Sequence, residues 1–505
     1  MIGILSPMLC LYSACPILLS GSCKCKTAKD HTELLQVVVD AANNKQDTTG
    51  LRVISLASDG KSCCGKALTN LTYVAPLAPS SPIYDHLVHL NLMDFFVGQD
   101  NITMDKDYKH VFKQLHNALL CKNGCLVHSV HLTCAVICKH FKDSGFTNAH
   151  ISHVLNPMDK QDVVLAYGLL KDLWSLPLAD PVSSTPTYIK VHKALCTYGK
   201  LSYHLVFPYI CIDQSLSEQL EHLSAAVHLV LVLYVLDNTQ SEFIPSPLFI
   251  DIGIMVKNTF FCVAKAKVDH PNEPFFLVLL GTDRLESLFE ILCTMVGNNT
   301  NLDILQLSLC VTSTTEVSSI LAKHPEWDKG PCQLRLPIVS RTFDDLTNSV
   351  DHIGPGAYLC SERLYPSSLT LATPWKRGWH LIENKYSWIT PILQSISSTK
   401  NASILAPYGI CLMASSLTGD VNDTGMEEDT PSCNTDPSIC ISDALDVTIG
   451  MQELEDAIAE AQWHNSETYG QGSYSHSVQI GGMAIKKSRI ITQQFRYMTS
   501  ASSTD

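Results

Sequence analysis

The sequence predicts an α/β protein that ends in an irregular, acidic C-terminal tail, and three observations lead to this class. Residues 51–57 form a short β-rich run followed by a Ser-Asp-Gly turn, which is typical of a strand and its turn. Several longer segments have apolar residues at the spacing of an amphipathic helix. Residues 401–485 contain 13 acidic residues and neither Lys nor Arg. Within this tail, residues 414–440 are polar and poor in aromatics, so we expect them to be disordered.

Each predicted element follows from local periodicity or from the residues that begin and end it. Helices are predicted at residues 30–48, 107–120, 159–174, 215–236, 251–267, 283–295 and 451–462. Acidic residues begin the 159–174 segment, where they suit the positive end of a helix. Residues 66–76 are predicted to form a second strand. Residues 335–400 are rich in Pro, Ser and Gly, and we expect them to be irregular.

The formal net charge of −14 arises almost entirely from the tail. Outside residues 401–485 the chain has 35 basic and 36 acidic residues, so a nucleic-acid-handling origin is not excluded by charge. Arginine is scarce, with 8 Arg beside 20 Cys and 20 His. Arg codons that begin with CG become Cys, His or Gln codons by single cytosine deaminations. The composition therefore suggests a body that was once more basic, with ordinary compositional drift as the alternative.

The apolar segments do not predict a membrane protein. Residues 1–22 are apolar, but no Lys or Arg precedes the apolar run, and Pro7 and Pro16 interrupt it. We therefore favour a buried strand or the edge of a larger domain over a signal peptide. The most apolar helical stretch, residues 225–236, is shorter than a membrane span and contains His228. We expect a core helix there and no membrane partner.

Two motifs could bind a phosphate or a metal ion. Residues 60–66 match part of a phosphate-binding loop, but Ala67 stands where the motif needs a hydroxyl for Mg²⁺; we favour a polar turn. Residues 121–140 hold seven Cys and His residues, at Cys121, Cys125, His128, His131, Cys134, Cys138 and His140. Their spacing does not resolve into the two pairs of a common zinc site. A structural role is favoured, and zinc binding is left open. A Gly-x-Ser-x-Gly nucleophile motif is absent from the sequence.

Three acidic positions could together serve phosphoryl transfer. Asp59 follows the first predicted strand, Asp107 begins a predicted helix, and Glu286 shares a helix face with Asp283. Two-metal catalysis needs carboxylates that converge from different elements. Taken singly, however, each of these acids is more often a helix cap or a solvated residue.

Five segments together resemble transposon-derived proteins of mushroom-forming fungi, which are distantly similar to P element-type transposases. The segments span nearly the whole chain, at residues 51–68, 105–120, 155–174, 249–289 and 486–505. The Asp-x-x-His-x-x-Lys pattern that begins at Asp107 and the Asp-x-Leu-Glu-x-Leu-Phe pattern that begins at Asp283 resemble shared transposase elements. Each pattern is moderately specific, and their order adds weight.

The resemblance implies an RNase H-like mixed sheet interrupted by a helical insertion. The implied organisation starts with the first part of the core at residues 1–150, the insertion at 151–270 and the closing part of the core at 271–345. It continues with an irregular extension at 346–413, a disordered acidic linker at 414–450, and an isolated helix and tail at 451–505.

The resemblance also implies a site and a reaction class. Asp59, Asp107 and Glu286 would bind Mg²⁺ for DNA strand transfer or cleavage, with Asp283 as the neighbour of Glu286. Asp105 is a rival for Asp107. The other two residues of the first pattern, His110 and Lys113, would face phosphate or hold their helix against the sheet. DNA is the implied partner and the nucleus the implied location, and a homo-oligomer is left open.

Departures from the family pattern imply a degraded, inactive enzyme. Cys residues stand at 63, 64, 121 and 293, where the family carries Arg, and Glu290 stands in place of a Gly. Each lost phosphate contact weakens DNA binding and lowers its dependence on salt. The alternative class is a non-catalytic protein that binds zinc or takes part in nuclear interactions.

Overall fold

The computed structural model divides the chain into two compact units, residues 1–444 and 445–505. We describe each unit by itself. The structure describes residues 26–58, 62–156, 162–182, 184–237, 243–282, 285, 288–289, 292, 304–323, 336–340, 343–350, 361–413, 477–480 and 483–486.

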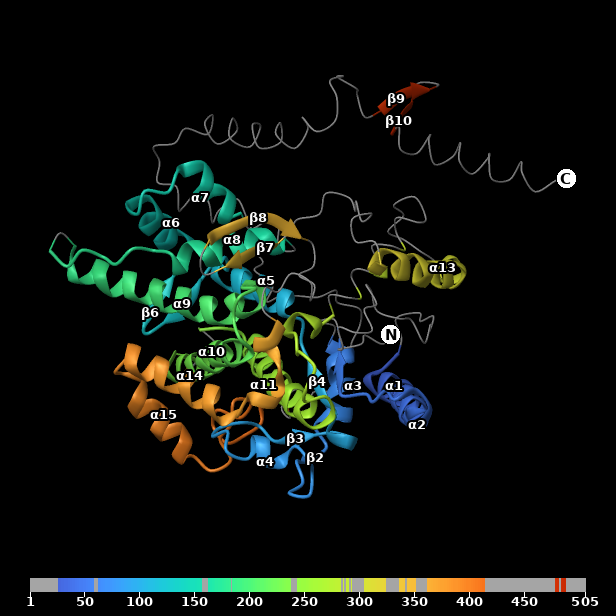
Figure 1. Ribbon diagram of the computed structural model, residues 1–505. Helices are drawn as coiled ribbons and strands as arrows, with labels where there is room; N and C mark the ends of the chain where they lie inside the picture. Colours follow the sequence, from blue (N-terminus) through green and yellow to red (C-terminus); the bar gives the residue numbers. More distant parts are fainter. Residues whose placement is uncertain are drawn as a thin grey trace. The chain divides into compact units, whose positions relative to one another are not determined.

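The described part of the first unit is mostly helical (Figure 1). Its helices are α1 (Ala28–Asn43), α2 (Gln46–Thr49), α3 (Ser62–Thr72), α4 (Tyr84–Leu87), α5 (Tyr108–Leu119), α6 (Cys134–Asp143), α7 (Asn148–Val154), α8 (Val163–Trp174), α9 (Pro186–Ile210), α10 (Leu216–Asp237), α11 (Ser246–Asp269), α13 (Ile304–Lys323), α14 (Ala372–Lys385) and α15 (Ile389–Ser398). Short 3₁₀ turns lie at η2 (Gln99–Asn101), η3 (Leu277–Leu279), η6 (Ser361–Leu364) and η7 (Pro366–Ser368).

The described strands form small two-stranded sheets. In the first unit the strands are β1 (Ser55–Ala57), β2 (Ala75–Pro76), β3 (Phe96–Val97), β4 (Thr103–Asp105), β5 (Cys125–Val127), β6 (Val130–Leu132), β7 (Leu336–Ser340) and β8 (Phe343–Val350). β1 pairs with β4 in parallel, whereas β2–β3, β5–β6 and β7–β8 are antiparallel. The α/β expectation therefore holds only coarsely. Among the described residues, no single mixed sheet of the RNase H kind joins these strands.

The β1–β4 pair rests on α11. Its register joins Ser55 to Thr103, Leu56 to Met104 and Ala57 to Asp105. From α11, Asn258 Oδ1 accepts hydrogen bonds from the hydroxyls of Ser55 (2.9 Å) and Thr103 (2.6 Å). Two turns further along α11, the buried Lys265 ammonium donates to the Ile54 carbonyl at 2.6 Å. These polar contacts hold β1 and β4 against the helix because buried polar groups need partners.

The hydrophobic core is built around α10 and α11. Both helices are long and apolar enough to cross a membrane, but most of their apolar residues are buried inside the body. In α10 the residues from Leu223 to Leu233 are almost fully buried on every side. A helix that is apolar all round is typical of a protein interior as well as of a membrane. Both helices are therefore core helices in this structure, as expected for residues 225–236.

Helical periodicity predicted five of the described helices, but it did not predict α9, the longest of them, or α13. Residues 30–48, 107–120, 159–174, 215–236 and 251–267 correspond to α1, α5, α8, α10 and α11. For the segment predicted at 283–295, the described residues 285, 288, 289 and 292 are helical. These predictions are confirmed. Apolar residues at helical spacing form a stripe along one side of a helix, and burial of that stripe in the core stabilises the helix.

The strand predicted at residues 66–76 is wrong for most of its length. Residues 62–72 form α3, and β2 covers only Ala75–Pro76. The helix buries Cys63, Ala67 and Leu68, which lie on one face at helical spacing. The hydroxyl of Thr72 donates to the carbonyl of Leu68 at 2.8 Å. Such a bond lets a β-branched Thr fit a helix.

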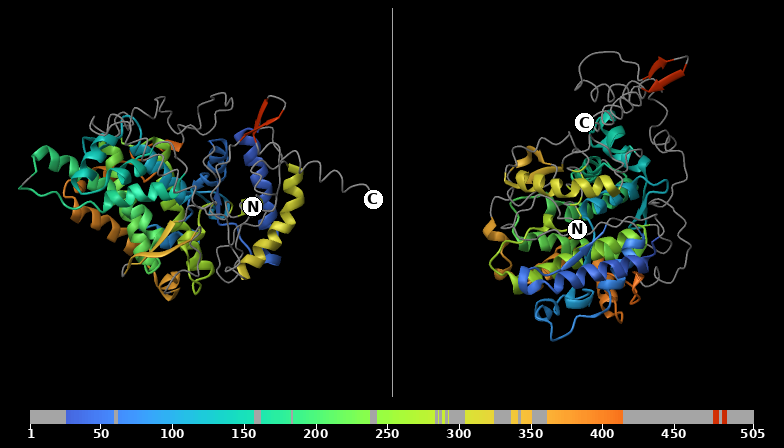
Figure 2. Two further views of the ribbon diagram at one scale, coloured as in Figure 1. Left: turned by 90° about the horizontal axis from the view of Figure 1, so that it is seen from above. Right: turned by 90° about the vertical axis from the view of Figure 1, so that its right-hand side faces the viewer.

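The irregular extension predicted at 346–413 is also wrong in part, because it contains α14 and α15. α14 lies along α10, as Figures 1 and 2 show. The Trp375 side chain is 1% exposed, and its ring N–H donates to the Asn91 carbonyl at 2.9 Å. Gly378 allows α14 to approach the α10 backbone closely. The surrounding Pro, Ser and Gly residues concealed this helix because its stability comes from packing on α10.

The described part of the second unit is one antiparallel hairpin. It consists of β9 (Ser477–Ile480) and β10 (Met483–Lys486). The predicted disordered linker at 414–450, the predicted helix at 451–462 and the apolar residues 1–22 lie outside the described residues.

Candidate functional site

The junction between β4 and α5 places two buried carboxylates two residues apart. Asp105 ends β4, and Asp107 is the N-cap of α5. Each residue is 2% exposed. Oδ1 of Asp107 accepts hydrogen bonds from the backbone N–H groups of Lys109 (2.8 Å) and His110 (3.1 Å). Aspartate is a favoured N-cap because it satisfies N–H groups that lack partners within the helix.

A segment distant in sequence closes over both carboxylates. The backbone N–H of Gly281 donates to Oδ2 of Asp105 at 2.7 Å. The backbone N–H of Thr282 donates to Oδ2 of Asp107 at 2.9 Å. Gly281 has φ +85°, and a Cβ there would lie 2.8 Å from Oδ2 of Asp107. Glycine is therefore required both for this backbone conformation and for the close approach.

The two carboxyl groups have pKa values displaced in opposite directions. Burial raises the pKa of Asp105 to about 7, and the nearby charge of Asp107 adds to that rise. Burial would also raise the pKa of Asp107, but the His110 side chain and the Thr282 N–H outweigh it and lower this pKa to about 2. Near neutral pH, Asp107 is therefore a permanent anion, whereas Asp105 can hold or release a proton. Pairs of carboxyl groups with divergent pKa values are typical of functional sites.

A third carboxylate, whose side chain is 14% exposed, approaches the same junction from α11. Asp251 lies 3.2 Å from the Lys106 ammonium. Burial raises the pKa of Asp251, while Lys106 and Gln114 counteract part of that rise. Because Lys106 lies between Asp105 and Asp107 in the chain, one ion pair links α11 to the junction.

The structure brings three of the sequence-predicted site residues onto α5. His110 Nδ1 lies 3.6 Å from Oδ1 of Asp107. Lys113 is half-buried one turn further along the helix. The predicted arrangement of carboxylate, imidazole and ammonium along one helix is thus present, although Asp107 is engaged as a helix cap.

The other predicted carboxylates, Asp59, Asp283 and Glu286, lie outside the described residues. The described residues next to them in the chain are nevertheless close together. Ala57, two residues before Asp59, pairs in register with Asp105. Thr282, directly before Asp283, is hydrogen-bonded to Asp107.

Two residues of this site were not found by sequence reasoning. Asp251 begins the helix predicted at residues 251–267, where an acid is typical of an exposed first turn, but α11 begins at Ser246 and places Asp251 in its second turn. Gly281 lies in a Leu-Leu-Gly-Thr run without a recognisable motif. A single acid within the otherwise apolar start of α11 was the one signal that could have indicated Asp251.

The Cys and His residues of 121–140 do not form one cluster. Cys125 is buried in β5, His131 is exposed on β6, and His128 stacks on Trp388. His140 pairs instead with His192 of α9, with 3.1 Å between their Nδ1 atoms. Burial raises the pKa of the Cys125 and Cys138 thiols, which disfavours the thiolates that zinc requires. In the described chain, the group of three close metal-ligating side chains is a different one, formed by His31, Cys63 and Cys64.

In comparisons with known proteins, no family model, no curated protein and no solved structure matches the chain. A functional interpretation therefore depends on the geometry of the site.

Proposed function

We propose that the chain is a transposase-derived protein with a degraded, Mg²⁺-dependent site for DNA cleavage or strand transfer. The observation that carries this proposal is the meeting of three chain segments at the β4–α5 junction. Each of these segments either contains a candidate carboxylate or directly adjoins one in the sequence. Carboxylates converging from separate elements are the requirement of two-metal phosphoryl transfer.

In the proposed fold, β1 and β4 are the central parallel strands of an RNase H-like sheet. The helices α8 to α11 would contribute the helical insertion at residues 151–270. The parallel register of β1 and β4 supports the proposal because it aligns the ends of both strands at one edge.

Within this site we propose Asp105 as the metal ligand contributed by β4. Asp105 ends the strand that pairs with β1, and its carboxyl pKa of about 7 makes it sensitive to a nearby cation. Asp107 is more fully engaged, because it accepts hydrogen bonds from three backbone N–H groups and the Thr282 hydroxyl, whereas Asp105 accepts two from backbone N–H groups. Asp107 would then position α5 and residues 281–282, and Asp59 and Glu286 would complete the ligand set.

The donor set of this site fits magnesium only in part. Carboxylate oxygens are the ligands that Mg²⁺ prefers, and a bound ion would activate water or a DNA hydroxyl group. Asp105 and Asp107 are, however, buried and already hydrogen-bonded, and the described carboxylates do not form a three-ligand group. Those hydrogen bonds compete with a metal ion for the carboxylate oxygens, which supports the proposal that the site is degraded and inactive. Lys113 and His110 would contact phosphate on the solvent side of α5.

Divalent-metal-dependent DNA cleavage tests this proposal. Purified protein would be incubated with supercoiled and linear DNA in Mg²⁺, Mn²⁺ or chelator. Retained activity should require a divalent ion and should fall by orders of magnitude in Asp59→Ala, Glu286→Ala and Asp105→Asn. The exposed Asp47→Asn is the matched control. Metal-dependent activity that survives all three substitutions would overturn the site assignment.

If no cleavage is detected, a measurement of magnesium binding distinguishes a degraded metal site from the absence of a metal site. Calorimetric titration should then detect a weak Mg²⁺ or Mn²⁺ site that Asp105→Asn removes and Asp47→Asn retains. Equal binding by these two variants would contradict the proposal. DNA as partner and the nucleus as location follow from the same proposal.

The alternative function is a non-catalytic protein that binds zinc, as the sequence left open. The specific observation in its favour is the His31, Cys63 and Cys64 group.

A further inference from the structure

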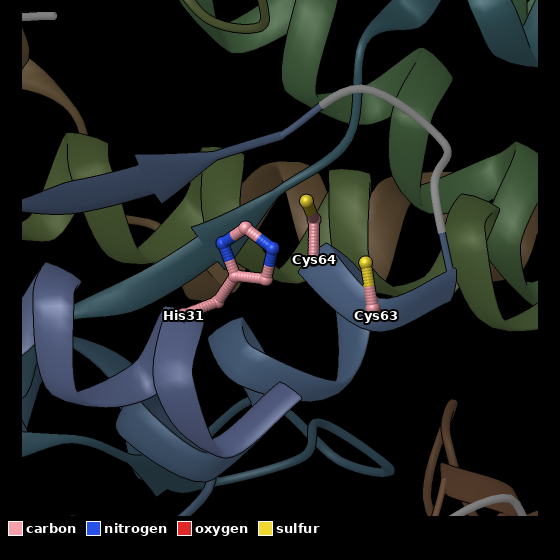
Figure 3. A group of neighbouring side chains, drawn as sticks. All are labelled: His31, Cys63 and Cys64. Atoms are coloured by element: carbon pink, nitrogen blue, oxygen red, sulfur yellow. The ribbon is translucent and has the colours of Figure 1, made fainter. Parts of the chain in front are cut away.

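Three side chains with metal-binding atoms meet between α1 and α3 (Figure 3). His31 lies in the first turn of α1, and Cys63 and Cys64 lie in the first turn of α3. The ligand atoms of the three residues all lie within 4.8 Å of one another. Figure 3 shows the imidazole and both thiols directed into the same space. The group lies outside the carboxylate site described above.

The local structure explains why these side chains meet. α1 begins with a capping box in which Thr27 and Asp30 satisfy each other's backbone N–H groups, and His31 follows directly. α3 contacts α1, and the side-chain amide of Asn70 donates to the Thr32 hydroxyl at 3.2 Å. The position of His31 beside the thiols is therefore set by regular helices and their contact.

The donor set selects a thiophilic ion of the zinc type. Two thiolates and one imidazole are common zinc ligands, with Zn–S near 2.3 Å and Zn–N near 2.0–2.1 Å. Tetrahedral coordination at those lengths separates the ligand atoms by about 3.4–3.8 Å. The observed limit of 4.8 Å leaves about 1 Å to be closed by side-chain rotation. The hard ions Mg²⁺ and Ca²⁺ prefer oxygen ligands, so this group is suited to a different metal from the carboxylate site.

The surroundings of the three side chains allow a metal ion to enter. Cys63 is buried, whereas His31 and Cys64 are half-exposed. An ion can therefore arrive from solvent, and a water molecule can take the fourth position. Binding would displace the two thiol protons to solvent.

A metal at this position would have a structural consequence for α1. Among the 16 residues of α1, Val39 is the one that is buried against the described chain. Little apolar burial holds the helix in place, so its attachment should be weak. We propose that His31, Cys63 and Cys64 bind one Zn²⁺ ion and that this ion fastens α1 to α3.

Zinc stoichiometry under reducing conditions is the first test. The full chain is stripped of metal and titrated with Zn²⁺ in competition with a chromophoric chelator. The double variant Cys63→Ser/Cys64→Ser should lose one equivalent of tightly bound Zn²⁺ relative to wild type. The matched control Cys196→Ser/Cys310→Ser removes two half-buried thiols outside the group and should keep that equivalent. Equal Zn²⁺ stoichiometry in wild type and both double variants would overturn the proposal, because it would show that Cys63 and Cys64 lie near His31 without binding zinc.

His31→Gln keeps the proposal testable if the double cysteine variant fails to fold. His31 is half-exposed near the start of α1, so its replacement should preserve the fold, as circular dichroism would verify. Its Zn²⁺ affinity should fall by roughly tenfold or more. Co²⁺ substitution adds a spectroscopic readout, since sulfur-to-cobalt charge-transfer absorption requires thiolate ligands. Wild-type affinity in His31→Gln would contradict the assignment of this ligand.

Hydrogen exchange tests the link to α1. Zn²⁺ should slow amide exchange in α1 of the wild type severalfold and leave α1 of His31→Gln unchanged. Zinc binding without slower exchange in α1 would refute the fastening role. These outcomes do not depend on the proposed DNA activity, because Asp59→Ala and Glu286→Ala should retain the Zn²⁺ equivalent.

Discussion

At the scale of single residues, environment separates two acids that look equivalent in the sequence. Asp107 was predicted to be a metal ligand, with Asp105 as its rival. In the structure Asp107 caps α5 and holds residues 281–282 by hydrogen bonds, whereas Asp105 has fewer donors around it. Their pKa values diverge because burial dominates for Asp105 and interactions that favour the anion dominate for Asp107.

The raised pKa of Asp105 predicts a loss of stability as pH rises. The folded state favours the protonated carboxyl up to about pH 7, whereas the ordinary value is 3.8. Between these values the folded state binds more protons than the unfolded state, so the free energy of unfolding decreases with rising pH. The wild type should lose on the order of 2–4 kcal/mol between about pH 4 and pH 7 through this group.

Denaturant unfolding across this pH range measures that contribution. Asp105→Asn should flatten the slope, whatever its effect on absolute stability. The exposed Asp47→Asn should keep the slope of the wild type. An unchanged slope in Asp105→Asn would mean that Asp105 titrates normally in the folded protein.

At the scale of elements, helices with a local apolar stripe were predictable, and those held by distant partners were not. α5 shows its pattern within its own sequence, with Val111, Phe112 and Leu115 buried on one face. α14 contains Pro and Gly residues and depends on α10 for its burial. The strand predicted within residues 51–57 is present as β1, but it is only three residues long.

A glycine at the contact between α14 and α10 provides a test at this scale. A Cβ at Gly378 would lie 2.5 Å from the Glu221 carbonyl oxygen and 2.6 Å from the Ala225 nitrogen. These are backbone atoms, and shifting them would disturb the hydrogen bonds and packing of α10. Gly378→Ala should therefore destabilise the protein by about 1–3 kcal/mol.

Gly168→Ala is the matched control for Gly378→Ala. Gly168 lies inside α8, where a Cβ would meet only Val154 at an ordinary 3.7 Å. Alanine should therefore stabilise α8 by about 0.5–1 kcal/mol. Thermal unfolding would compare the two variants, and equal effects would show that the α14–α10 contact is looser than described.

At the scale of the whole molecule, charge is distributed unevenly between body and tail. The net charge of −14 depends on 13 acidic residues between positions 401 and 485. The remaining chain is nearly neutral, and its described interior contains ion pairs such as Lys257 with Asp94 at 2.6 Å. A nearly neutral body has no strong electrostatic barrier to DNA, whereas the tail supplies one.

Neutralising the tail should strengthen non-specific DNA binding. Replacing the 13 acids by their amides in the full chain changes the net charge from −14 to −1. Affinity for a DNA duplex should rise severalfold at low salt, and the gain should vanish near roughly 0.5 M salt because charges are then screened. Fluorescence anisotropy across a salt series measures both effects. Equal affinity at low salt would show that the tail does not repel DNA.

The candidate site illustrates how much could be predicted from the sequence. The placement of Asp107, His110 and Lys113 along one helix was predicted from their spacing, which depends only on the geometry of that helix; their role in a site stays a prediction. The contribution of Gly281 could not be recognised, because it depends on a contact between residues 176 positions apart. Asp251 was hidden for the same reason, since its partner Lys106 lies on a different element.

The sequence by itself determined the helices α1, α5, α8, α10 and α11, the neutral body and the acidic tail, because periodicity and charge are properties of neighbouring residues. Only the tertiary structure decided that residues 62–72 are helical, that α14 packs on α10, and that His31 meets Cys63 and Cys64. Each of these outcomes depends on burial against a partner distant in sequence, and that burial outweighs the weak local preferences of the residues involved.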